Sequence, residues 1–189
     1  MKKDYEQLIN NYSGGDLDLS GCEMKTLELG NIEGSLNLSK ATIDKLSIGW
    51  VSETLNLTGA DIKTFVRPID AKNVNMTGTK VKKMPEHVGA DYFTVEKSNI
   101  TKLSSDIRVN TLNIKNTKIE QLPKDMRVNS LIVDSKTAKN LPLSTIRQCG
   151  SMEIDGFTYV ESNVSVDGYN FCSVNSEACG CGQENCTCC

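Results

Sequence analysis

Large apolar residues recur every nineteen positions over most of this chain, and this spacing constrains the fold more than any other feature. The series keeps its interval six times in succession and consists of Leu17, Leu36, Leu55, Val74, Phe93, Leu112 and Leu131. A fixed period near twenty residues is typical of a solenoid, in which each coil stacks on a copy of itself. The spacing therefore predicts one continuous rod of repeated coils.

Four further apolar series keep the same interval. The nearest starts two residues after the leading residue, which is the alternation of a short strand with one buried face. The second series is Leu19, Leu38, Leu57, Met76, Val95, Ile114 and Val133. The third is Met24, Ile43, Ile62, Val81, Ile100, Ile119 and Ala138, and the fourth is Leu27, Leu46, Phe65, Met84, Leu103, Leu122 and Leu141. A looser fifth series contains Trp50, Ile69, Val88, Ile107 and Met126.

Each coil is too short to contain a helical crossover. Nineteen residues accommodate a strand, a bend, a second extended piece and a return, so the strands must stack in parallel about 4.8 Å apart. Gly21, Gly59 and Gly78 lie at the bend, where glycine permits unusual backbone angles. We therefore expect a mainly β, single solenoid of seven or eight coils.

The repeat resembles the leucine-rich repeat, most clearly in the segment TLNIKNTKIEQLP at 111–123. It is most similar to the short repeats of bacterial effector proteins, in which LxLxxNxLxxLP recurs about every twenty residues. The family's buried Asn at the bend is replaced here by Cys, Ala, Thr or Ser, so the bends must satisfy their hydrogen bonds in another way. A right-handed parallel β-helix therefore stays open as the alternative fold. The catalytic ubiquitin-ligase domain of those effectors has no counterpart in this chain.

Both ends of such a rod need a cap, because the last coil on each side exposes its apolar interior. Tyr5, Leu8 and Ile9 suit one side of a short amphipathic helix at the first end. At the other end Met152 and Ile154 resemble an eighth strand pair that arrives two residues late. The predicted organisation is an N-terminal helical cap at 1–13, the solenoid at 14–156, a closing strand or hairpin at 157–171, and a cysteine-rich tail at 172–189.

The closing hairpin is expected to turn at Asp167 and Gly168. The tail beyond it holds six of the eight cysteines, which are Cys172, Cys179, Cys181, Cys186, Cys188 and Cys189. Thiolates two residues apart can converge on one soft ion, so this spacing predicts a zinc or copper site. A disulfide knot, a reduced tail without a function and lipidation of the terminal Cys-Cys are the alternatives.

The outward strand positions form a polar ladder that consists of Asp18, Asn37, Asn56, Asn75, Thr94, Asn113 and Ile132. Stacked Asn and Thr side chains can bond to one another and serve only to stabilise the coils. The alternative is that this face binds a partner protein where the ladder stops being uniform. The candidate partner-binding residues are Tyr92, Thr94, Glu96, Asn113, Lys115 and Ile132. Among them we expect an exposed Tyr92 to be the main anchor.

The remaining features favour a soluble, cytoplasmic monomer. The formal charge of −3 is too balanced to indicate nucleic acid or an anionic membrane as the partner. The first twelve residues contain no secretory signal, and no apolar run reaches the length of a membrane span. The single histidine, His87, is expected to face solvent and is weak evidence for a ligand or an acid–base group.

These observations lead to three hypotheses. The first is a non-enzymatic module of bacterial or phage origin that binds a partner protein on its strand face, as an effector or inhibitor of a host factor. The second is a metal-binding protein that carries the thiolate tail on its rod. The third is a solenoid enzyme that acts on polysaccharide, although no recognised catalytic motif is present.

Overall fold

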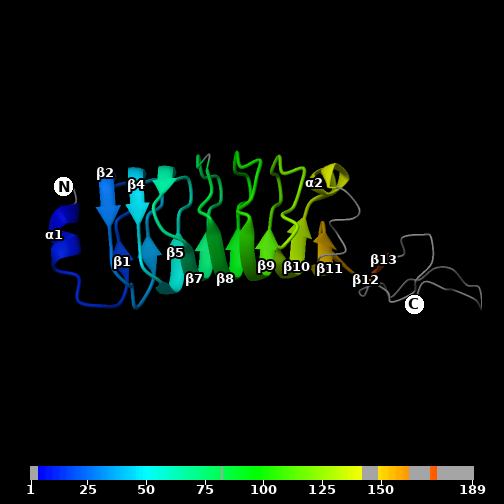
Figure 1. Ribbon diagram of the computed structural model, residues 1–189, viewed down its shortest axis with the longest axis horizontal. Coiled ribbons are helices and arrows are strands. Elements are labelled where there is room, and N and C mark those ends of the chain that lie inside the picture. Colours follow the sequence, from blue (N-terminus) through cyan, green and yellow to red (C-terminus); the bar gives the residue numbers. More distant parts are fainter. Residues whose placement is uncertain (1–3, 82, 142–148, 162–170, 174–189) are drawn as a thin grey trace, which may run out of the picture.

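The chain forms a rod whose strands lie across its long axis (Figure 1). The computed structural model describes residues 4–81, 83–141, 149–161 and 171–173 of the 189. Its strands form parallel ladders that repeat every nineteen residues, and only its last strands, beyond the solenoid, pair antiparallel. The predicted mainly β solenoid is therefore confirmed.

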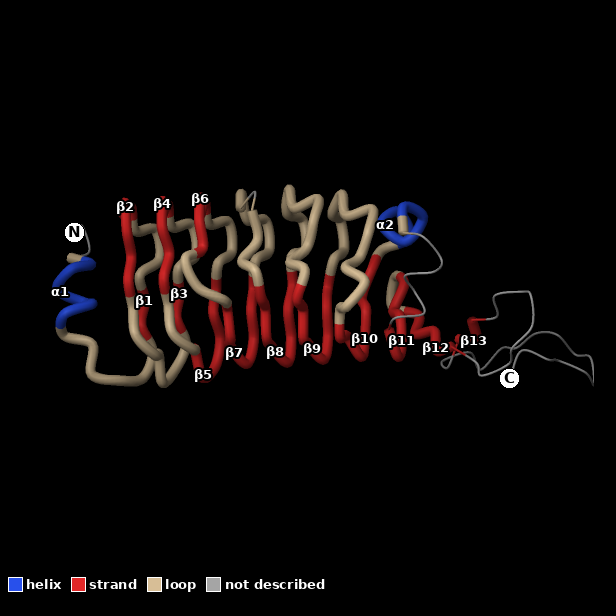
Figure 2. Tube along the Cα trace, in the orientation of Figure 1, coloured by secondary structure: helices blue, strands red, loops and turns tan. Residues whose placement is uncertain are grey.

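Two sheets run along the rod (Figure 2). The main sheet has the order β1-β3-β5-β7-β8-β9-β10-β11-β12-β13. Its strands are β1 Leu17–Asp18, β3 Leu36–Asn37, β5 Val51–Asn56, β7 Ile69–Asn75, β8 His87–Thr94, β9 Asp106–Asn113, β10 Arg127–Val133, β11 Cys149–Ile154, β12 Phe157–Glu161 and β13 Phe171–Ser173. The minor sheet contains β2 Glu23–Glu28, β4 Thr42–Ser47 and β6 Asp61–Phe65.

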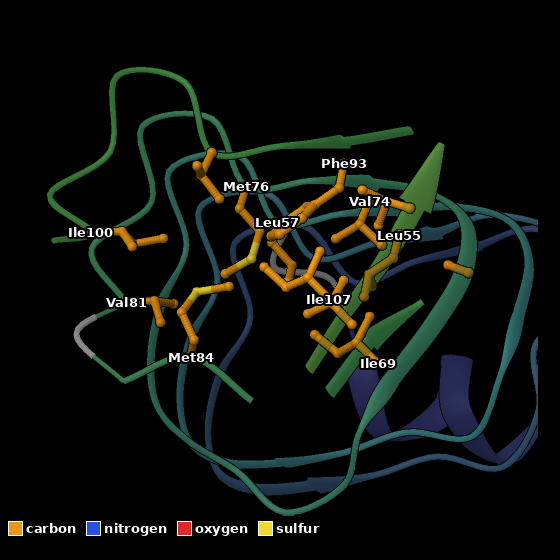
Figure 3. Close-up of a cluster of buried hydrophobic side chains, with 14 of the residues drawn as sticks. Leu55, Leu57, Ile69, Val74, Met76, Val81, Met84, Phe93, Ile100 and Ile107 are labelled. Atoms are coloured by element: carbon orange, nitrogen blue, oxygen red, sulfur yellow. The ribbon is translucent and has the colours of Figure 1, made fainter. Parts of the chain in front are cut away.

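The leading residues stack directly on one another. Leu17 pairs with Leu36, Leu36 with Leu55, Leu55 with Val74, Val74 with Phe93, Phe93 with Leu112, and Leu112 with Leu131. No member of this series exceeds 5% exposure, and every member of the second series is fully buried. Figure 3 shows Leu55, Val74 and Phe93 gathered in the interior. Met152 then pairs with Leu131 after twenty-one residues, which confirms the late eighth pair.

The fifth series was wrong at Trp50, whose side chain is 47% exposed. Strand β5 contains an irregularity that lies between Val51 and Thr54. Val51 pairs with Ala71 twenty residues on, whereas Thr54 pairs with Asn73 nineteen residues on. The extra residue reverses the direction of the side chains before it. Val51, which pairs with Ala71, is consequently buried, and the preceding Trp50 is exposed.

The minor sheet ends after three coils, where a proline removes one donor from its ladder. In the third coil the N–H of Val66 donates to the carbonyl of Leu46 at 2.8 Å. Pro85 occupies the equivalent place in the fourth coil and has no N–H to donate. In the described part of the fourth, fifth and sixth coils the second extended piece forms no strand, while the main sheet continues (Figure 2).

The helix α1, Tyr5–Asn10, lies at the first end of the rod (Figure 1). Its Tyr5 hydroxyl donates to the carbonyl of Ser20 at 2.9 Å, and Tyr5 and Ile9 pack against the core. Leu8, which was expected on the same side, is 40% exposed. No helix in the described part of the chain combines the length and the apolar character needed to cross a bilayer.

The opposite end differs from the prediction in two places. The seventh coil contains an unpredicted helix, α2 Ser135–Asn140, which begins where the Asp134 side chain accepts from the N–H of Thr137 at 2.9 Å. Strands β11 and β12 are joined by Asp155 and Gly156, both with positive φ, in a two-residue hairpin turn. The expected turn at Asp167 and Gly168 lies outside the described residues.

Candidate interaction surface

The outward polar ladder has a structural role, because its side chains bond to one another across coils. The Nδ2 of Asn56 donates to the Oδ1 of Asn37 at 3.2 Å, and the Nδ2 of Asn37 donates to the Oδ1 of Asp18 at 3.0 Å. Because Asp18 is an acceptor only, it fixes the direction in which the amides point. The ladder thus links successive coils side chain to side chain.

The same side chains close the bends. The Oδ1 of Asn56 accepts from the N–H of Thr58 at 3.1 Å, and Asn75 does the same for Thr77 at 3.0 Å. Thr94 uses its Oγ1 for the N–H of Glu96 at 3.2 Å. These bonds of an Asn or Thr side chain to the N–H two residues on satisfy backbone donors at the bends.

The structure brings four of the six candidate partner-binding residues into two small polar clusters. The Nδ2 of Asn113 lies 3.3 Å from the Tyr92 hydroxyl and 3.4 Å from the Oε2 of Glu96. The Nζ of Lys115 lies 3.2 Å from the Oε1 of Glu153 on β11. Ile132 pairs in register with Asn113 and with Glu153, so it lies between the two clusters.

These residues are less exposed than the alternation predicted. Thr94 and Asn113 are buried at 6% and 7% exposure, and Tyr92, Lys115 and Ile132 are half-buried. For Asn113 the reason is its contact with two longer side chains, those of Tyr92 and Glu96. Their role in binding a partner stays a prediction.

A hollow of about 540 Å³ lies beside these residues on the main sheet. It crosses four strands and is lined by Asp70, Ala71 and Lys72 of β7, Gly89, Ala90 and Asp91 of β8, Arg108, Val109 and Asn110 of β9, and Arg127 and Asn129 of β10. Sequence reasoning did not find it.

The hollow forms where the strands bend. Val88 and Phe93 are both fully buried although five residues separate them, as are Ile107 and Leu112. A flat strand points residues an odd distance apart to opposite faces, so each strand must bend between its two buried residues. This five-residue interval is visible in the sequence and is the signal that could have located the bend.

Charges of both signs surround the hollow. The Nζ of Lys72 lies 3.0 Å from the Oε2 of Glu53, and the Nε of Arg108 lies 3.0 Å from the Oδ1 of Asp106. The Nδ2 of Asn110 donates to Asp91 at 2.9 Å. Arg127 makes no ion pair with any described residue. The hollow is therefore polar around an apolar floor.

His87 is half-buried between two carboxylates of neighbouring coils, and not solvent-facing as expected. Its Nδ1 lies 2.8 Å from the Oδ2 of Asp106, and its Nε2 lies 3.4 Å from the Oδ1 of Asp70. A Cβ on Gly89 would lie 2.5 Å from that Asp70 oxygen, so glycine makes room for the cluster. The bond from His87, together with Arg108, lowers the pKa of Asp106.

The cysteines give no metal site in the part of the chain that is described. Cys22 and Cys149 are both buried and free. Burial raises the pKa of Cys22, and it raises the pKa of Cys149 to about 11. Of the predicted metal ligands, Cys172 lies in β13, whose side chains are not described, and Cys179, Cys181, Cys186, Cys188 and Cys189 lie outside the described residues. No group of three or more His, Cys, Asp or Glu among the described side chains is arranged to hold a metal ion.

Comparison with known proteins found no matching family model, no matching curated protein and no matching solved structure.

Proposed function

We propose that this chain is a non-enzymatic interaction module that binds a partner protein on the outer surface of its main sheet. The observation that carries this proposal is the hollow over β7–β10, which lies beside the less uniform end of the polar ladder. It offers a concave, charged surface at the bend of four neighbouring strands. The half-buried Tyr92 lies on β8, and the half-buried Lys115 lies in the turn just beyond the end of β9, so both extend the proposed surface.

The contacts of His87 support a structural role for this residue and not a catalytic one. Both ring nitrogens face a carboxylate, at 2.8 Å and at 3.4 Å. A general acid or base needs one nitrogen within hydrogen-bond reach of the substrate. In this arrangement His87 ties the coils of β7, β8 and β9 together through Asp70, which lines the hollow, and Asp106.

Affinity purification from the native host tests the proposal with a matched pair of charge reversals. The test variant combines Lys72→Glu with Arg127→Glu, both exposed on the hollow. The control combines Lys25→Glu with Lys45→Glu, both exposed on the minor sheet. Each pair changes the net charge by the same amount, so a general charge effect cancels.

A partner captured by the unaltered chain and by the control, but lost with the hollow variant, supports the proposal. Equal capture by both variants places the binding surface elsewhere. Far-UV circular dichroism of both variants must match that of the unaltered chain, so that loss of capture reports the surface and not the fold.

A further inference from the structure

Two arginines stand directly opposite each other at one end of the hollow. Arg108 of β9 pairs in register with Arg127 of β10, and both are exposed. Like charges directly opposite on adjacent strands destabilise a sheet. Asp106 compensates Arg108 through its contact with Nε, whereas Arg127 has no carboxylate partner among the described residues. This end of the hollow therefore has an uncompensated positive charge.

The other end of the hollow is acidic. Asp70 of β7 and Asp91 of β8 line it, and their partners are the half-buried His87 and the neutral amide of Asn110. Lys72 also lines this end, but Glu53 on β5 compensates its charge. The hollow thus changes from acidic to basic along the axis of the rod.

A floor of small and apolar side chains joins the two ends. Ala71, Ala90 and Val109 occupy equivalent places on β7, β8 and β9, and Val109 is only 5% exposed. A floor without large side chains lets a bound backbone approach the sheet closely. The charged side chains then stand on either side of it.

Resting on the proposed function, we propose that the hollow binds an extended segment of the partner with a carboxylate over Arg108 and Arg127 and a cationic group over Asp70 and Asp91. Guanidinium groups bind carboxylates through paired hydrogen bonds. Arg127 on β10 and Asp70 on β7 are the outermost charges of the two ends and stand in one register row, three strand spacings apart, which is about 14 Å. In an extended chain, residues i and i+4 point to the same side and lie about 13–14 Å apart. The partner segment therefore presents an acidic and a basic residue four positions apart.

The acidic end of the hollow argues against a nucleic acid as the occupant. A phosphate backbone that crossed the strands would place negative charge over Asp70 and Asp91 as well as over the two arginines. A segment with both signs of charge satisfies both ends at once.

Short capped peptides test this inference on the full-length chain. The probes are Glu-Ser-Thr-Ser-Lys and its reverse, compared with Glu-Ser-Thr-Ser-Glu and with a short single-stranded DNA. Binding is followed by amide and arginine side-chain chemical shifts in NMR. We expect one mixed-charge peptide to saturate with a dissociation constant on the order of 1 mM, with shifts confined to β7–β10. Arg127→Gln should weaken that binding roughly tenfold or more, because a charge-assisted bond is lost.

Three results would overturn the inference. The first is the absence of saturable chemical-shift changes with either mixed-charge peptide. The second is binding of the all-acidic peptide as tightly as the mixed-charge peptide. The third is binding of the DNA more tightly than the mixed-charge peptide. Asp91→Asn provides a second variant, which should weaken the mixed-charge peptide and spare the all-acidic one. If the peptides fail while the Lys72→Glu and Arg127→Glu variant still loses its partner, the proposed function stands and only the charge pattern falls.

Discussion

Replacement of Asn56 by alanine removes a link between coils and a bend closure in one step. Its Oδ1 accepts from the N–H of Thr58 at 3.1 Å and from the Thr58 hydroxyl at 2.7 Å, and its Nδ2 donates to Asn37 at 3.2 Å. Each such bond contributes about 0.5–1.5 kcal/mol, and water replaces part of this at a half-buried site, so the expected loss is about 2 kcal/mol. Asn75→Ala removes only the bond from Thr77 among the described contacts and should cost about 1 kcal/mol.

Urea unfolding followed by far-UV circular dichroism measures both losses. Asn56→Thr is the matched control, because Thr94 already closes the bend of the fifth coil through its hydroxyl. It should restore about half of the free energy of unfolding that alanine removes. If Asn56→Ala and Asn75→Ala lower this free energy equally at unchanged m-values, the bond between Asn56 and Asn37 contributes nothing and the ladder argument is wrong.

Three further predictions concern the bend, the acid limb of stability and the tail. Lys40 has a φ of 58° where Gly59 has 65° in the next coil, so Lys40→Gly should stabilise the fold by about 0.5 kcal/mol, seen as a raised Tm, and a lowered Tm would contradict this. The pKa of Asp106 is lower in the folded chain than its ordinary value of 3.8, so the ionised carboxylate stabilises the fold fully above that pH, and this stabilisation is lost as the pH falls through the lower folded value. Asp106→Asn should therefore make the free energy of unfolding fall less steeply at acid pH, and an unchanged slope would count against this prediction. If the tail binds zinc, metal retained through desalting should disappear when residues 172–189 are removed, whereas equal zinc in both proteins would refute a tail site.

The strict period made the pairing of the main sheet predictable to the residue. The prediction failed at Trp50, because a fixed period of nineteen residues cannot predict the extra residue in β5. The helix α2 was missed although Asp134 and Thr137 form a recognisable helix start. The turn at Asp155 and Gly156 was missed because the hairpin turn was assigned to the later Asp-Gly pair, Asp167 and Gly168.

The candidate site was less predictable than the core. The alternation of apolar and polar residues along a strand predicts which way a side chain points, but not how much of it the neighbouring side chains cover. Thr94 and Asn113 were therefore expected to be exposed, and they are buried. The cluster around His87 depends on Asp70 and Asp106, which lie seventeen residues before it and nineteen after it. Such contacts follow only once the register of three coils is known.

The equal length of the coils has a consequence for how such a chain can change. Insertion or deletion of one whole nineteen-residue unit would lengthen or shorten the rod by one strand spacing, about 4.8 Å, and leave every other side chain on its original face. An insertion of another size within a strand would turn the neighbouring residues away from their stacks unless a bulge or a longer connection absorbs it, as happens in β5 and between β10 and β11. Addition or removal of whole units would therefore change the distance between two surface features on the rod in steps of one strand spacing.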